Sequence, residues 1–307
     1  MAPRVADPIE YSTEGVYTFA RTGEYSLAVE DRPVHAEGWR TEVHTGERSN
    51  LAFSLLPIRV RFAGQDPTLL SPSVAAFTAP MGAYHRYPIS RQGQRTIFMS
   101  IPHRTWERPG FEHALDGAPP IPRIHAPSSP RAFALARQLV RYVHDPSARA
   151  EPLVLEETCA RIIDLSLDAA SESPGARIGA TPEGRTRQRE LVNAVQARLH
   201  EDAGRPWSLA ELADDVELSP AYLSRLFRAH TGMTITRALT IERIAHALER
   251  LPHQRGNLAR VALASGFGSH ARMTQIFTAL LGVTPSAIAR QGPGATARTI
   301  DRLRNPA

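Results

Sequence analysis

An internal repeat in the last third of the chain constrains the fold more than any other feature of the sequence. Six residues of the segment 219–234 recur 50 positions later, and three residues upstream of them recur 49 positions later. The pairs at an offset of 50 are Ser219/Ser269, Ala221/Ala271, Phe227/Phe277, Ala229/Ala279, Gly232/Gly282 and Thr234/Thr284, and those at 49 are Leu209/Leu258, Ala210/Ala259 and Ala213/Ala262. The segment 209–234 therefore occurs twice, and the second copy, 258–284, has one residue inserted in its turn.

Each copy has the sequence pattern of a helix-turn-helix. Ser208 followed by Glu211 is a capping box, which predicts the start of a short first helix. After a turn, Ser219 caps a second helix with Pro220 in its first position, and Gly232 ends that helix. The residues predicted to face the core are Leu223, Leu226 and Phe227 in the first copy and Met273, Ile276 and Phe277 in the second.

The two copies differ in their turns and are joined by a predicted long helix. The second copy has Gly266, which suits a turn position with positive φ, whereas the first has Glu217 there. We therefore expect the first turn to be less strained or to be held in another way. Over 234–251, the apolar residues Ile241, Ile244 and Leu248 have helical spacing. Two helix-turn-helix units on a rigid connector fit successive major grooves of DNA, about 34 Å apart.

The segments that carry this pattern resemble the AraC/XylS family of transcription regulators. The matching segments are LAELA and SPAYLSRLFRAHTG in the first unit, and VALASGFGS and QIFTALLGVTPSAIAR in the second. The N-terminal half is similar to the cupin-like effector and dimerisation arm of many members. The resemblance implies a regulator that binds promoter DNA, responds to a small-molecule effector, often activates transcription through RNA polymerase, and forms a homodimer.

The resemblance also implies which residues contact DNA. The base-contacting residues are Ala221, Ser224 and Arg225 in the first unit and His270, Arg272 and Gln275 in the second. Arg225 suits guanine and Ala221 the thymine methyl group, while Gln275 suits adenine at a position where the family often has arginine. A phosphate contact or an internal salt bridge is the alternative for Arg225. The predicted phosphate contacts are Arg228, Arg260 and Arg290, with simple solvation as the alternative.

The distribution of charge supports an anionic partner for the C-terminal half. The chain has 36 basic and 31 acidic residues, and every basic residue is arginine. Residues 1–180 hold 19 arginines and 20 acids, and 181–251 hold ten of each, whereas 252–307 hold seven arginines and only Asp301. A basic segment of this kind indicates an anionic partner, a solvated face being the alternative. The lack of lysine excludes Schiff-base chemistry and a P-loop.

The N-terminal half is predicted to be rich in β-structure. Apolar runs at 17–31, 51–64, 73–80 and 94–102 are separated by Gly and Pro, which suggests an antiparallel barrel or sandwich. Apolar residues at helical spacing predict two helices, at 131–144 and 153–170, which pack on the barrel or pair with a second subunit. The predicted fold class is α+β: a cupin-like barrel with two flanking helices, followed by an all-α domain.

Composition predicts four segments along the chain. We expect an effector-sensing and dimerisation domain at 1–175 and a Ser-, Pro- and Gly-rich linker at 176–185. The DNA-binding domain is expected at 186–291, followed by a mobile basic tail at 292–307. No apolar run reaches the length of about 20 residues that spans a bilayer, and the N-terminus has no secretory signal. The expected location is the cytoplasm.

The sequence offers little support for an enzyme or a metal site. His35, His44 and His85 form no HxH pair, and Glu42 and Glu47 do not complete a cupin metal pattern. No hydrolase or metalloprotease motif is present, and the single cysteine, Cys159, has the spacing of a core residue. We expect no cofactor and no enzymatic activity; a metal-dependent cupin enzyme fused to a DNA-binding domain and an effector-free regulator are the alternatives. The aromatic residues considered for core or effector pocket are Trp39, Phe53, Phe77, Tyr84, Tyr87 and Trp106.

Overall fold

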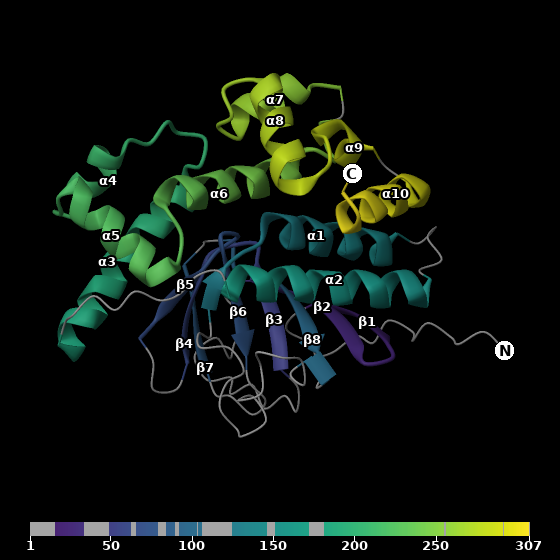
Figure 1. Ribbon diagram of the computed structural model, residues 1–307, viewed down its shortest axis with the longest axis horizontal. Coiled ribbons are helices and arrows are strands. Elements are labelled where there is room, and N and C mark those ends of the chain that lie inside the picture. The colour runs from purple at the N-terminus through teal and green to yellow at the C-terminus, as the bar shows by residue number, and fades with distance from the viewer. Residues whose placement is uncertain are drawn as a thin grey trace.

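The computed structural model has a β-rich N-terminal half followed by a helical C-terminal half (Figure 1), which confirms the predicted α+β class. The structure describes residues 16–33, 49–62, 66–78, 84–89, 92–102, 104–105, 125–145, 151–171, 181–254, 256–290 and 292–306. The strands are β1 (Val16–Thr22), β2 (Tyr25–Arg32), β3 (Ser49–Ser54), β4 (Ile58–Phe62), β5 (Thr68–Leu70), β6 (Val74–Thr78), β7 (Tyr84–Pro88), β8 (Gln94–Ile101) and β9 (His125–Pro127).

The described strands form two antiparallel sheets instead of the expected barrel. One has the order β1-β2-β8-β3-β6-β9 and the other the order β5-β4-β7, and no pairing among described residues closes either sheet on itself. The apolar run at 51–64, predicted as one segment, divides at Pro57 into β3 and β4, which belong to different sheets. Proline has no N–H for a sheet ladder, so the chain leaves one sheet there and enters the other.

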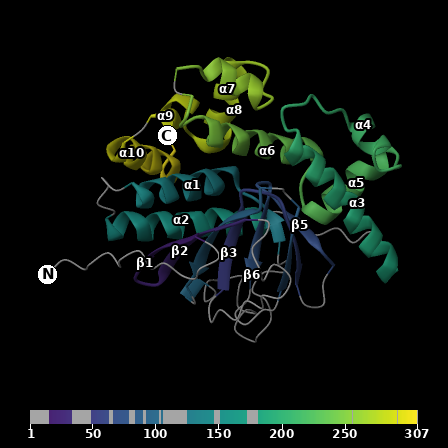
Figure 2. The same cartoon turned by 180° about the vertical axis from the view of Figure 1, so that it is seen from behind.

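The helices are α1 (Pro130–His144), α2 (Pro152–Ser171), α3 (Pro182–Glu201), α4 (Leu209–Asp214), α5 (Pro220–Thr231), α6 (Ile235–Arg250), α7 (Leu258–Ala264), α8 (His270–Leu281), α9 (Pro285–Ala289) and α10 (Pro293–Arg304). Helices α1 and α2 lie on one side of the six-stranded sheet with α6 to α10 as a second tier over them, whereas α3 to α5 lie at the end of the molecule that carries the smaller sheet (Figures 1 and 2). The rings of Phe53 on β3 and Phe133 on α1 meet edge to face, with centroids 6.0 Å apart. Of the two alternatives for the helices after the strands, the structure therefore shows packing on the sheet.

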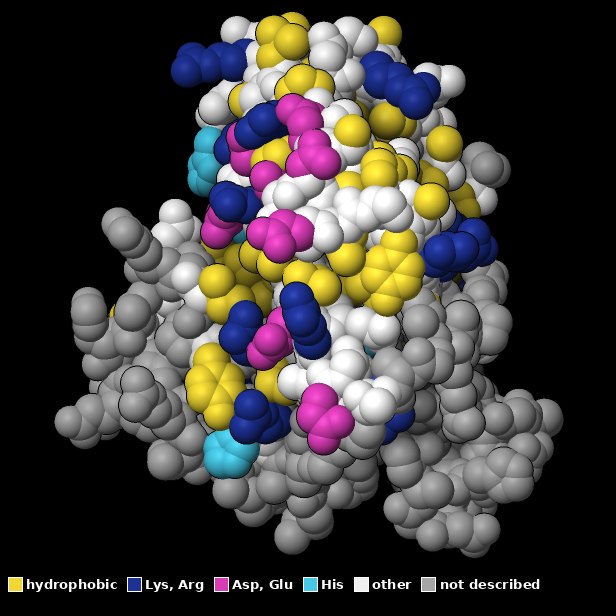
Figure 3. Space-filling view, turned by 90° about the vertical axis from the view of Figure 1, so that its left-hand side faces the viewer, with side chains coloured by type: hydrophobic (Ala, Val, Ile, Leu, Met, Phe, Trp, Pro, Cys, Tyr) yellow, Lys and Arg dark blue, Asp and Glu magenta, His cyan; other side chains and the backbone are white. Residues whose placement is uncertain are grey.

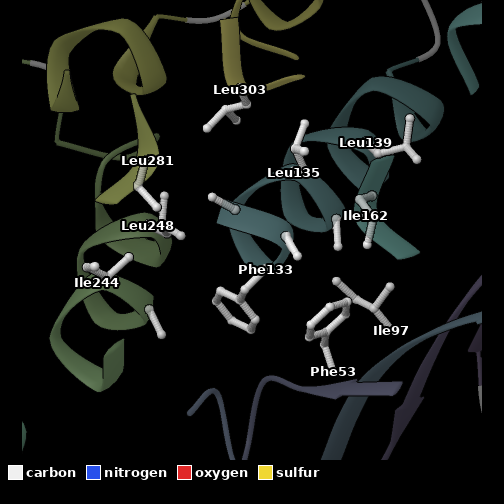
Figure 4. Close-up of a cluster of buried hydrophobic side chains, with 14 of the residues drawn as sticks. Phe53, Ile97, Phe133, Leu135, Leu139, Ile162, Ile244, Leu248, Leu281 and Leu303 are labelled. Carbon is white, nitrogen blue, oxygen red and sulfur yellow. The ribbon is translucent and has the colours of Figure 1, made fainter. Parts of the chain in front are cut away.

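A shared apolar core joins the two halves of the chain (Figure 4). Phe133 and Leu135 of α1 lie between the sheet residues Phe53 and Ile97 and the C-terminal helices. The C-terminal residues that the same core contains include Ile244, Leu248, Leu281 and Leu303. A second cluster joins strands β3 to β7 with α3, α5 and α6. The helical half is therefore packed on the β-rich half, and residues 176–180 of the predicted linker lie outside the described residues.

The basic segment at 292–307, predicted as a mobile tail, contains a packed helix. Helix α10 contacts α1, and its Ile300 and Leu303 are buried in the shared core. Pro293 is in the first turn, where a missing N–H costs no hydrogen bond. Only a few apolar residues form the buried face of α10, and a Gly-Pro-Gly sequence precedes them, so the periodicity was too short to indicate a helix.

Candidate nucleic-acid interface

The first helix-turn-helix unit consists of α4 and α5, and its caps are those that the sequence predicts. The backbone N–H of Ser208 donates to Glu211 Oε2 at 2.9 Å, and the N–H of Glu211 donates to Ser208 Oγ at 3.1 Å. These bonds hold the pKa of the Glu211 carboxyl below its usual value. Ser219 Oγ accepts from Tyr222 N at 3.3 Å, and Gly232 ends α5 with φ +78°. The start and end of the second helix are thus fixed by local bonds.

The turns of the two units have the same backbone path, which corrects the expectation for the first turn. Glu217 has φ +55°, so it adopts the left-handed conformation that Gly266 adopts with φ +78°. The N–H of the next residue then bonds back to a carbonyl oxygen, from Leu218 to Ala213 in the first unit and from Phe267 to Ala262 in the second, both at 2.9 Å. The first turn is therefore no less strained than the second.

The structure explains why only the second turn needs glycine. A Cβ added to Gly266 would lie 2.5 Å from the carbonyl oxygen of Ala203 and 2.7 Å from Nε of Arg243, whereas the side chain of Glu217 is exposed. The extra residue of the second copy is Gly268, which also has positive φ, +74°. The second turn packs against the segment between α3 and α4, and this contact leaves no room for a side chain.

The predicted DNA-contacting residues of α5 share one exposed face. Ala221, Ser224, Arg225 and Arg228 follow one another at intervals of three, one and three residues, and all four side chains are exposed. The opposite face of α5 is fully buried by Leu223, Leu226 and Phe227. Arg225 makes no hydrogen bond or ion pair with another described residue. Its guanidinium group is therefore available for a partner outside the chain.

The predicted residues of α8 do not all share one face. Arg272 donates to Gln275 Oε1 at 2.7 Å, so these two exposed side chains lie together. His270 is exposed, but at 3.6 residues per turn it lies about 140° around the helix from Gln275. Ala271, which the offset of 50 pairs with Ala221, is exposed and lies about 40° from Gln275. Ala271 was not among the residues predicted to contact DNA, although the repeat pairs it with the predicted residue Ala221.

The predicted phosphate contacts are exposed, as a phosphate-binding residue must be. Arg260 follows the Asn257 cap of α7, and Arg290 follows α9. Arg228 also lines a cavity of about 500 Å³, whose other lining residues include Pro127 of β9 and residues of the α5–α6 turn. Arg228 therefore borders the junction between the halves of the chain as well as the outer face of α5.

The structure divides the basic charge of 252–307 between two places. Arg260, Arg272 and Arg290 are on or beside the second helix-turn-helix unit, whereas α10 carries Arg298, Arg302 and Arg304. Arg304 also forms an ion pair with Glu157 of α2. Figure 3 shows acidic and basic side chains intermixed on the end of the molecule that carries α3, α4 and α5, in keeping with the equal charges of 181–251.

The remaining sequence predictions concern a metal site, an effector pocket and a membrane segment. No group of three or more His, Cys, Asp or Glu side chains in the described part of the chain is arranged to hold a metal ion.

Phe53, Phe77 and Tyr84 are buried in the apolar clusters, as is Cys159. His85 is exposed and Tyr87 is half-buried. The residues that lie outside the described ranges are His35, Trp39, Glu42, His44, Glu47 and Trp106. No helix within those ranges is long and apolar enough to cross a bilayer.

The C-terminal half of the chain matches a known domain family. A helix-turn-helix domain family matches residues 212–291. The chain is 28% identical over 183 residues to a putative AraC-like transcription regulator of Streptomyces lividans, which covers 57% of each protein. It is 31% identical over 101 residues to the HTH-type transcriptional activator RhaR of Escherichia coli K12, covering 33% of this chain and 36% of RhaR. The chain spans a little over half of the length of the first of these relatives.

Among solved structures, ToxT from Vibrio cholerae O395 is 11% identical, with a TM-score of 0.32 over 87% of this chain and 97% of ToxT. A TM-score this low supports no conclusion about the fold or the function of this chain. The two capped helix-turn-helix units, joined by helix α6, define the C-terminal half as a double helix-turn-helix domain. The chain is thus similar to AraC-like transcription regulators over its C-terminal half.

Proposed function

We propose that this chain is a cytoplasmic, sequence-specific regulator that binds promoter DNA as a homodimer and activates transcription in response to a small-molecule effector. The observation that carries the proposal is the exposed face of α5. Its four residues are held on a helix whose opposite face is buried, and Arg225 has no partner among described residues. A recognition helix needs this combination, because base readout requires exposed donors on a rigid support.

The shared core supports an effector response. Because α1 contacts the sheet on one side and α8 and α10 on the other, a ligand that moves the sheets also moves the DNA-binding units. RhaR is named as an activator, which favours activation over repression. Contact with RNA polymerase and pairing with a second copy follow from the same resemblance and are part of the proposal.

The proposal is tested by selecting genomic DNA fragments on the immobilised full chain and measuring affinity for the selected site by fluorescence anisotropy. Arg225→Ala should weaken binding about 5- to 150-fold and relax the preference at one base pair. Arg302→Ala, an equal change at an exposed position of α10, should leave the affinity within about twofold. Equal loss on selected and random DNA would show that Arg225 contacts phosphate only, and failure to enrich any fragment would contradict the proposed function.

A further inference from the structure

The segment that links the two sheets is bonded to the DNA-binding half. Residues 71–73 connect β5 of the smaller sheet with β6 of the larger one, and the backbone N–H of Val74 donates to the Ser71 carbonyl at 2.9 Å. The hydroxyl groups of Ser71 and Ser73 lie 2.9 Å apart. This corner is one of the connections between the two sheets, together with the segment at Pro57, so a movement of one sheet relative to the other displaces it.

A buried carboxylate of helix α6 receives the bonds from this corner. Glu242 is 1% exposed, and its Oε1 accepts from Ser71 Oγ at 2.7 Å and from Ser73 N at 3.1 Å. Its Oε2 accepts from Nδ1 of His200 on α3 at 2.8 Å. Burial raises the pKa of this carboxyl, but the bonds from His200, Ser71 and Ser73 outweigh that effect and lower the pKa overall. Glu242 is therefore ionised, and its charge depends on groups from both halves of the chain.

Asn193 of α3 makes a second set of hydrogen bonds to the N-terminal half, at strand β5 and the residue before it. Its Oδ1 accepts from Leu69 N at 3.0 Å, and its Nδ2 donates to the Pro67 carbonyl at 2.9 Å. Asn193 is 2% exposed, and β5 is at the edge of its sheet. The backbone groups that an edge strand leaves without partners are thus bonded to the DNA-binding half. We call Ser71, Ser73, Asn193, His200 and Glu242 the polar seam.

We propose that the polar seam is the point through which the N-terminal sheets set the position of helix α6, and that Glu242 is the positioning residue. The proposal rests on the proposed function, because α6 connects the two helix-turn-helix units. The predicted DNA-contacting side chains are exposed while the seam is closed, so the seam does not cover them. Instead, the closed seam restricts α6 to fewer orientations, so DNA binding costs less conformational entropy. Opening the seam therefore weakens DNA binding.

The state of the seam is measured by hydrogen exchange on the full chain. The amides of Leu69 and Ser73 both donate to seam side chains, so peptides covering 67–74 report its opening. Glu242→Gln replaces an acceptor oxygen by an NH₂ group that faces a donor. Exchange of the Ser73 amide should rise about tenfold or more, as the loss of a bond to a charged group predicts. Exchange of the β3 residues Leu51 to Phe53 should not change.

Two further variants separate positioning from folding. Ser71→Ala removes a single donor and leaves the charge bonded by Ser73 and His200, so it reports the seam even where Glu242→Gln unfolds the chain. Glu201→Gln makes the same charge change as Glu242→Gln at an exposed position on the end of α3 and should alter neither exchange nor DNA affinity.

Affinity for a selected DNA site is measured on the same variants. We expect Glu242→Gln to weaken binding at least about fivefold, with Ser71→Ala between it and the wild type. Faster exchange at 67–74 with unchanged or tighter DNA binding would overturn the positioning role, as would unchanged exchange in both seam variants. A chain that binds no DNA contradicts the proposed function, and the exchange of the 67–74 peptides then tests the seam independently of DNA.

Discussion

The contact of Gly266 with the segment between α3 and α4 predicts that two glycines of one turn have very different tolerance of a side chain. Gly266 and Gly268 have nearly equal φ values, +78° and +74°. A Cβ on Gly266 would lie 2.5 Å from the Ala203 carbonyl oxygen, to which Arg243 Nε already donates at 2.9 Å. A Cβ on Gly268 has no described heavy atom within 4 Å.

The expected changes in the free energy of unfolding follow from these two environments. Gly268→Ala carries only the penalty of a left-handed residue, about 1–2 kcal/mol. Gly266→Ala adds the strain of forcing atoms apart, about 1–3 kcal/mol, and so should lower the free energy of unfolding by about 2–5 kcal/mol. Glu217→Gly relieves the same backbone strain in the first turn, and should stabilise by less than about 1 kcal/mol because glycine is also freer in the unfolded chain.

Urea-induced unfolding of the full chain, followed by circular dichroism, compares the three variants under identical conditions. The reasoning is refuted if Gly266→Ala and Gly268→Ala are equally destabilising, since the close approach to Ala203 would then have no energetic consequence. Destabilisation by Glu217→Gly would refute the assignment of strain to the first turn.

Three further predictions concern charge, pH and packing. Arg260→Gln and Arg290→Gln should each reduce the slope of log affinity against log salt by about 1, measured by anisotropy between 50 and 200 mM salt, whereas an unchanged slope would show solvated side chains. Burial and the nearby His200 lower the pKa of His246 to about 4, below its unfolded value of about 6.5, so its protonation opposes folding. Stability should therefore be complete above pH 6.5 and fall by about 2 kcal/mol by pH 5, and His246→Gln should remove that loss in urea titrations at both pH values. Leu303→Ala should cost about 2–5 kcal/mol in the same unfolding assay, whereas a mobile tail would make the substitution neutral.

The sequence predicted those parts of the fold that local bonds determine. Ser208 and Ser219 cap their helices as predicted, because a cap and its N–H partner lie within three residues. The core residues of α5 could be predicted equally well, since helical periodicity alone places Leu223 and Phe227 on one face. In the same way, the exposed face of α5 follows once its buried face is known.

Tertiary contacts determine the parts that the sequence did not predict. Nothing near Glu242 in the sequence indicates burial, because its hydrogen-bond donors lie about 170 residues earlier and on another helix. The docking of α10 depends on α1, which a periodicity of only a few residues does not indicate. The two-sheet arrangement depends on strand pairing over long separations, so the apolar runs were compatible with a barrel as well.

The segment between α3 and α4 ties the two DNA-binding units together at a point separate from helix α6. Arg243 of α6 donates to the carbonyl oxygens of Ala203 and Arg205, and the Gly266 turn of the second unit packs on the same backbone. The units are thus connected twice, through α6 and through this contact, and α6 is further held by Glu242 in the polar seam. A body held at several points changes orientation as a whole, so under the proposed function opening of the seam moves both helix-turn-helix units together.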